Sequence, residues 1–142
     1  KIHSTNIADY GGVATKMPIF AAFFMLFSMA NAGLPGTSGF VGEFMVIMGA
    51  MQTKFIYALF AGFALILGAA FSLWMYKRVI FGEVTNDHVA QMKDVNGFEF
   101  VVLALFAIGV IWMGVYPEIF VAKIQLGVRD LVIQVASSKI GR

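Results

Sequence analysis

Long apolar runs alternate with short polar stretches along the chain. The first run, residues 17–52, holds a single charged residue, Glu43, and is followed by the apolar runs 55–76 and 98–116. A helix rises about 1.5 Å per residue, so about 20 apolar residues cross the hydrocarbon core of a bilayer, which is about 30 Å thick. The pattern predicts an all-α polytopic membrane protein with three transmembrane helices, with polar loops at 1–16 and 77–97.

The first apolar run is too long for one straight span and contains a cluster of helix breakers. As a continuous helix, residues 17–52 would extend about 54 Å. Two short re-entrant pieces or one interrupted span would fit this length. The breakers favour an interrupted span, with halves over Met17–Asn31 and Phe40–Gln52. The predicted break consists of Gly33, Leu34, Pro35, Gly36, Thr37, Ser38 and Gly39.

A break inside a membrane helix frees backbone N–H and C=O groups that lipid cannot satisfy. Pro35 lacks an N–H and clashes with the preceding turn, while the glycines around it allow unusual backbone angles and close approach. The hydroxyls of Thr37 and Ser38 are available to cap freed groups or to start the second half. Because such breaks are tolerated only where protein or water surrounds them, the segment is expected to face a hydrated protein interior.

Glu43 lies about one turn beyond the predicted break. An ionisable residue inside a membrane helix is a functional-site hypothesis, and a low-dielectric surrounding favours the neutral form of a carboxyl group. Glu43 is therefore the candidate proton-relay residue. The alternative is a structural role, in which Glu43 faces an interface or pairs with a buried lysine. The apolar runs of this chain hold no cation, so such a lysine would come from elsewhere.

The other polar residues are weaker candidates. His3 and His88 lie in predicted loops and are interpreted as solvated residues, and Ser72 and Asn31 as helix-packing residues. The chain has no Cys, and no group of His, Asp and Glu has metal-ligand spacing, so we expect neither a metal nor a cofactor site in this chain. A net charge of +2 without a basic block argues against nucleic acid as a partner.

The tail, residues 118–142, carries apolar residues at helical spacing and is more polar than the preceding runs. We expect an amphipathic helix that lies on the membrane or on a partner. A short terminal helix packed on its own domain is an equal alternative.

Four stretches resemble a known family. "IADYGGVATKMP" at 7–18, "MANAGLPGTSGFVGEFMV" at 29–46, "YKRVIFG" at 76–82 and "GVYPEIF" at 114–120 resemble the C-terminal part of the antiporter-like M subunit (subunit 4) of respiratory complex I, the proton-pumping NADH:quinone oxidoreductase. Related subunits, including those of multi-subunit cation/proton antiporters, commonly place a lysine where this chain has Glu43. The glutamate therefore indicates the M type.

The resemblance implies helices 12–14 of a 14-helix subunit in a bacterial plasma membrane or a mitochondrial inner membrane. Glu43 would be the terminal acid of a polar axis, and residues 1–16 and 77–97 would face the cytoplasm or matrix. The partners would be other membrane-arm subunits, especially neighbouring antiporter-like subunits, and the lipid bilayer. NADH, FMN, iron–sulfur clusters and quinone would bind in partner subunits. A cation/proton antiporter subunit without a redox partner, and a structural membrane scaffold, are the alternative functions.

Overall fold

A computed structural model describes residues 7–84 and 87–140, and all regular elements in this part of the chain are helical. The predicted all-α fold is confirmed for these residues. The elements in chain order are the 3-10 helix η1 (Ile7–Tyr10) and the α-helices α1 (Val13–Lys16), α2 (Pro18–Asn31), α3 (Ser38–Thr53), α4 (Phe55–Ile80), α5 (Asp87–Ala90), α6 (Gly97–Val115) and α7 (Glu118–Ile140).

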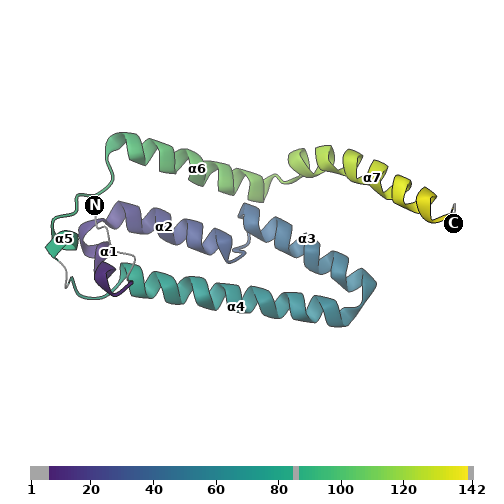
Figure 1. The fold of residues 1–142 in the computed structure, drawn as a ribbon. Coiled ribbons are helices and arrows are strands. Elements are labelled where there is room, and N and C mark those ends of the chain that lie inside the picture. The colour runs from purple at the N-terminus through teal and green to yellow at the C-terminus, as the bar shows by residue number, and fades with distance from the viewer. Residues whose placement is uncertain (1–6, 85–86, 141–142) are drawn as a thin grey trace.

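The broken segment lies between two longer helices. Helix α4 contacts both α2 and α3 on one side, and α6 contacts both on the other, as Figure 1 shows. Helix α7 continues from α6 and extends away from the other helices. The two halves of the broken segment are therefore held by the same two neighbours.

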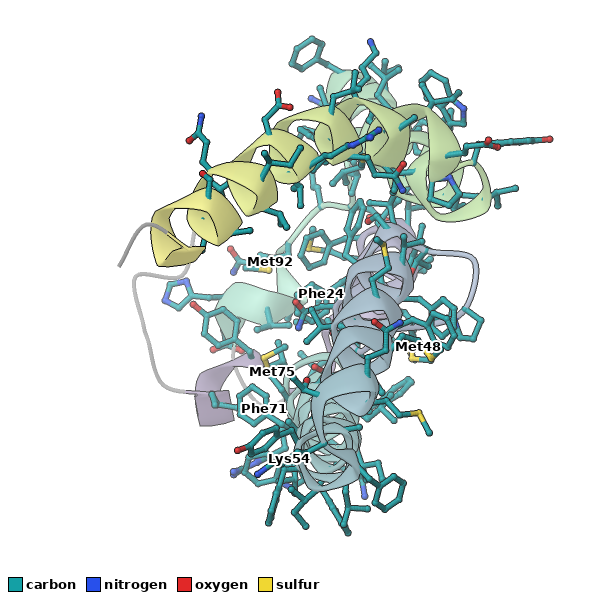
Figure 2. All side chains as sticks on the ribbon, turned by 90° about the vertical axis from the view of Figure 1, so that its right-hand side faces the viewer. Phe24, Met48, Lys54, Phe71, Met75 and Met92 are labelled. Atoms are coloured by element: carbon teal, nitrogen blue, oxygen red, sulfur yellow. The ribbon has the colours of Figure 1, made fainter. Side chains whose placement is uncertain are left out.

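Two helices, α4 and α6, are long and apolar enough to cross a membrane on the grounds of length and composition. Helix α2 is apolar but shorter, and α3 has 16 residues. Only 11% of the most apolar stretch of α4 and 6% of that of α6 are buried. Figure 2 shows side chains projecting outward around the helices, with Met48 pointing away from α3. An apolar surface this extensive fits a lipid or subunit environment.

A small core joins the segments at one end of the bundle. Val13, Tyr76, Ile80 and Val89 are buried together there, and the Tyr76 hydroxyl donates a hydrogen bond to the Ala21 carbonyl oxygen at 3.1 Å. The segments before α2 and after α4 thus lie at the same end of the molecule, as Figure 1 also shows.

The predicted loops need correction. The 1–16 segment contains η1 and α1, and its first six residues lie outside the described part. Helix α4 continues through Lys77 and Arg78, four residues past the expected end, because both residues favour a helix and the first breaker is Gly82, with φ +113°. The 77–97 loop also contains α5.

Candidate functional site: a carboxylate at a helix break

Helix α2 ends in a complete Schellman motif. Gly33 takes the left-handed conformation with φ +77°, its N–H donates to the Ala30 carbonyl at 3.2 Å, and the N–H of Leu34 donates to the Met29 carbonyl at 3.0 Å. These are the two hydrogen bonds that define the motif, and they satisfy carbonyls that a broken helix would leave unpaired. The end of α2 is therefore stabilised locally by its own sequence.

The six residues between the half-helices form a tight turn. Thr37 is 2% exposed, and both its N–H and its hydroxyl donate to the Leu34 carbonyl, at 3.1 and 2.7 Å. Gly36 has φ +88°, a conformation that side-chain-bearing residues rarely adopt. The hydroxyl of Thr37 thus closes the turn rather than capping α3.

The break is shorter than the sequence predicts, and the first turn of α3 packs beside the last turn of α2. Ser38 and Gly39, expected in the break, form the first turn of α3. A Cβ atom at Gly39 would collide with the Ala30 carbonyl oxygen in the last turn of α2. Gly39 is therefore required for the close approach of α3 to α2.

Helix α6 holds the break from the other side. A Cβ atom at Gly114 would collide with the Gly36 carbonyl oxygen and with the carbonyl carbon of Thr37. The turn backbone therefore lies directly on α6 at this glycine, and the break is enclosed by protein on that side.

The carboxylate of Glu43 lies against the backbone of the break. A Cβ atom at Gly33 would collide with Glu43 Oε2 and would lie 3.3 Å from the Glu43 carboxyl carbon and 3.5 Å from Leu65 Cδ2 of α4. Glu43 Oε2 is buried and accepts no hydrogen bond from residues 7–84 or 87–140. The absence of a side chain at Gly33 is what makes room for this oxygen.

Glu43 also lines a cavity of about 600 Å³ between the break and α4. Asn31 and Ser38 contribute polar side chains to its wall, while α4 contributes small residues, among them Ala64 and Gly68. A cavity of this size with several polar groups has room for ordered water. Asn31, expected as a packing residue, is thus a wall residue of this cavity.

The other residues considered in the sequence lie elsewhere. Ser72 is buried within α4, and His88 lies on α5, while His3 is outside the described residues. Glu99 Oε2 accepts the N–H of Asn96 at 2.9 Å and so caps the start of α6. Within residues 7–84 and 87–140, no group of three His, Asp or Glu side chains is arranged to hold a metal ion.

Sequence reasoning missed Asp94, which lies in the connection between α5 and α6. Its Oδ2 accepts the N–H of Ile19 at 2.9 Å, and its Oδ1 accepts the N–H groups of Phe20 at 3.2 Å and Val95 at 2.7 Å. Partial burial acts to raise the pKa of Asp94, but the three N–H donors favour the ionised form and hold the pKa below its usual value. The 74 and 75 positions that separate Asp94 from Phe20 and Ile19 leave no local sequence signal for this contact.

Comparisons with known proteins identify the family to which the chain is similar. The family model described as "NADH:quinone oxidoreductase/Mrp antiporter, TM" matches residues 1–72. The "NADH-ubiquinone oxidoreductase chain 4" of Marchantia polymorpha is 45% identical over 92% of this chain and 26% of its own length. The "NADH-quinone oxidoreductase subunit M" of Rhodobacter capsulatus is 42% identical over 93% of this chain and 26% of its own length.

A solved structure is similar in fold as well as in sequence. A chain in "Respiratory complex I from Thermus thermophilus with bound NADH" matches with a TM-score of 0.69 and 32% identity, over 81% of this chain and 24% of that chain. The chain described here spans about a quarter of the length of the relatives it matches.

Proposed function

The chain belongs to the transmembrane family of NADH:quinone oxidoreductases and Mrp antiporters, and on that premise we propose that it is the C-terminal part of a proton-translocating membrane-arm subunit of NADH:quinone oxidoreductase. Glu43 is the proposed proton-relay acid. The observation that carries the proposal is Oε2 of Glu43, which is buried against Gly33 at a helix break beside a cavity and accepts no hydrogen bond from the part of the chain that the structure describes. In the same proposal, α2 with α3, then α4, then α6 form three spans, and α7 is an amphipathic surface helix.

The geometry suits proton exchange for a physical reason. A buried polar atom without a hydrogen-bond partner costs about 1–3 kcal/mol, so a hydrogen-bond donor that reaches Oε2 is stabilised there. Asn31 and Ser38 line the cavity beside Glu43, so water bound to their polar side chains can reach the carboxyl group. A carboxyl group held this way takes up a proton from one side and releases it when its surroundings change.

The redox chemistry in this proposal belongs to partner subunits. The relatives are named as subunits of NADH-quinone or NADH-ubiquinone oxidoreductase, and the solved structure carries bound NADH. NADH, FMN, iron–sulfur clusters and quinone are therefore proposed to bind in partner subunits, with neighbouring antiporter-like subunits and lipid around this chain. The membrane is a bacterial plasma membrane or a mitochondrial inner membrane, with the η1, α1 and α5 end facing the cytoplasm or matrix.

Replacing Glu43 in the full-length subunit, within its assembled complex, tests the relay. Glu43→Gln keeps the shape but cannot bind and release a proton, so we expect NADH-driven proton pumping to fall strongly. Glu43→Asp keeps a titratable group and should retain part of the pumping. Glu118→Gln makes the same chemical change at an exposed carboxylate at the start of α7 and should leave pumping intact. Normal pumping by Glu43→Gln, with unchanged NADH oxidation, would show that Glu43 is not the relay.

A cation/proton antiporter subunit is the second candidate, because the family description covers both kinds of protein. Copurification separates the two functions. Flavin and iron–sulfur proteins bound to the full-length subunit support the oxidoreductase, and a complex without them supports the antiporter.

A further inference from the structure

The N-terminus of α2 has no capping residue of its own. Its N-cap position is Met17, whose side chain makes no cap hydrogen bond, and its first residue is Pro18, which has no N–H. The N–H of Ala21 reaches the Met17 carbonyl at 2.9 Å. Two N–H groups of the first turn, those of Ile19 and Phe20, therefore need an acceptor from outside the helix.

Asp94 supplies both acceptors. One carboxylate oxygen accepts from Ile19 and the other from Phe20, so every N–H of the first turn of α2 is satisfied. A carboxylate at this end of a helix is also favoured by the helix dipole. The contact is bidentate, which fixes the orientation of α2 as well as its distance from the loop.

The loop that carries Asp94 is itself anchored on both sides. Val89 of α5 is fully buried in the core at this end of the bundle, and Asn96 is fixed to the first turn of α6 by its hydrogen bond to Glu99. Asp94 is thus a fixed point rather than a side chain on a free loop. Its two hydrogen bonds tie the start of α2 to both α5 and α6.

We propose that Asp94 is a positioning residue for the Glu43 site, acting through α2; this inference rests on the proposed function of Glu43. Helix α2 has 14 residues, so Gly33 lies about 21 Å along the helix from the Asp94 contact. A helix is stiff along its axis, so displacement at its capped end moves Gly33 relative to Glu43 Oε2. Asp94 therefore sets the contact between the break and the carboxylate from the far end of the half-helix.

The test measures amide hydrogen exchange and proton pumping in the assembled complex that carries full-length subunit variants. Loss of a helix cap costs about 1 kcal/mol, which corresponds to about fivefold faster exchange. For Asp94→Ala we expect that increase in residues 18–24, increased exchange in residues 32–38, and fewer protons pumped per NADH oxidised. Asp94→Asn keeps one strong acceptor and should give smaller changes of the same kind, which also keeps the test informative if the alanine variant assembles poorly.

Asp87→Asn is the matched control, because it removes an exposed carboxylate at the start of α5, also between α4 and α6, and should change none of the three readouts. Unchanged exchange in residues 18–24 of Asp94→Ala would refute the cap. Faster exchange confined to 18–24, with normal pumping per NADH, would refute the positioning role and leave Asp94 as a local cap. Exchange does not depend on the role of Glu43, whereas pumping does. Faster exchange in both 18–24 and 32–38 with normal pumping, together with normal pumping by Glu43→Gln, would therefore refute the relay and not the mechanical link through α2.

Discussion

Replacing Gly33 by alanine should impair the Glu43 site more than its effect on backbone stability explains. The new Cβ atom would occupy the space that holds Glu43 Oε2 and would also contact Leu65 Cδ2 at 3.5 Å. The carboxylate therefore has to move by about 1 Å or more to restore an ordinary contact. A misplacement of that size at a reacting group costs up to about a hundredfold in rate.

The substitution also has a backbone cost, which must be separated from the effect on Glu43. Gly33 has φ +77°, and a residue with a side chain in the left-handed region costs about 1–2 kcal/mol. Gly36→Ala is the matched control, because Gly36 has φ +88° and, apart from its chain neighbours, no atom of the described residues lies within 4 Å of a Cβ atom there. Both variants carry the same kind of strain, but only Gly33→Ala contacts the carboxylate.

The assay is proton pumping per NADH oxidised, corrected for the amount of assembled complex, in membranes that carry each full-length variant. We expect both variants to assemble less well, by similar amounts. Pumping per assembled complex should fall about tenfold to a hundredfold in Gly33→Ala and stay near normal in Gly36→Ala. Equal pumping per assembled complex in the two variants would refute the conclusion that the space at Gly33 sets the position of the Glu43 carboxylate.

Three further predictions concern stability, measured as the thermal unfolding midpoint of the purified complex. Gly114→Ala should destabilise by about 1–3 kcal/mol, because its Cβ meets the turn backbone, whereas Gly109→Ala in the same helix meets nothing and should not destabilise. Tyr76→Phe should cost about 0.5–1.5 kcal/mol through loss of the hydrogen bond to Ala21. The stabilisation by Asp94 is the unfolding midpoint of the wild type minus that of Asp94→Ala. It should be constant above about pH 5 and disappear in acid, because the hydrogen bonds that lower the pKa of Asp94 in the folded state stabilise the fold only while its carboxyl group is ionised.

Opposite results are equally informative. A Gly114→Ala midpoint that matches Gly109→Ala would mean that the turn does not rest on α6. A Tyr76→Phe midpoint equal to that of the wild type would show that the hydrogen bond from the Tyr76 hydroxyl to Ala21 makes no net contribution to stability. An Asp94 contribution that grows as the pH falls would contradict the lowered pKa.

The local pattern of the sequence was sufficient to predict the broken helix. A proline among glycines interrupts a helix, so the end of the first half at Asn31 follows from local rules, whereas the second half begins at Ser38, two residues before the predicted Phe40. The end of α4 at Ile80 was harder to predict, because Lys77 and Arg78 mark the edge of an apolar run without ending a helix. Polarity indicates where a chain can leave the bilayer, and helix propensity decides where the helix stops.

The packing of the break was beyond sequence reasoning, because it depends on residues distant in the chain. Glycines are common in membrane helices, and among the glycines of α6 it is Gly114 at which a Cβ atom would meet the turn at Gly36 and Thr37. Asp94 looks like a solvated loop acid in the sequence, and its bond to Ile19 depends on how α5 and α6 return to the start of α2. Local hydrogen bonds are predictable from spacing, whereas contacts such as these require the tertiary fold.

The glycines of the break show why residue type alone does not identify a role. Gly36 is needed only for its backbone angle. Gly39 has a helical backbone conformation, so it is needed only for the close approach to the Ala30 carbonyl oxygen. Gly33 is needed for both its angle and the space that Glu43 occupies. The two requirements at Gly33 are physically independent, because the left-handed angle disfavours an L side chain in any surroundings, whereas the contact arises only because the Glu43 carboxyl group lies there. The link between the break and the carboxylate therefore lies in that one missing side chain.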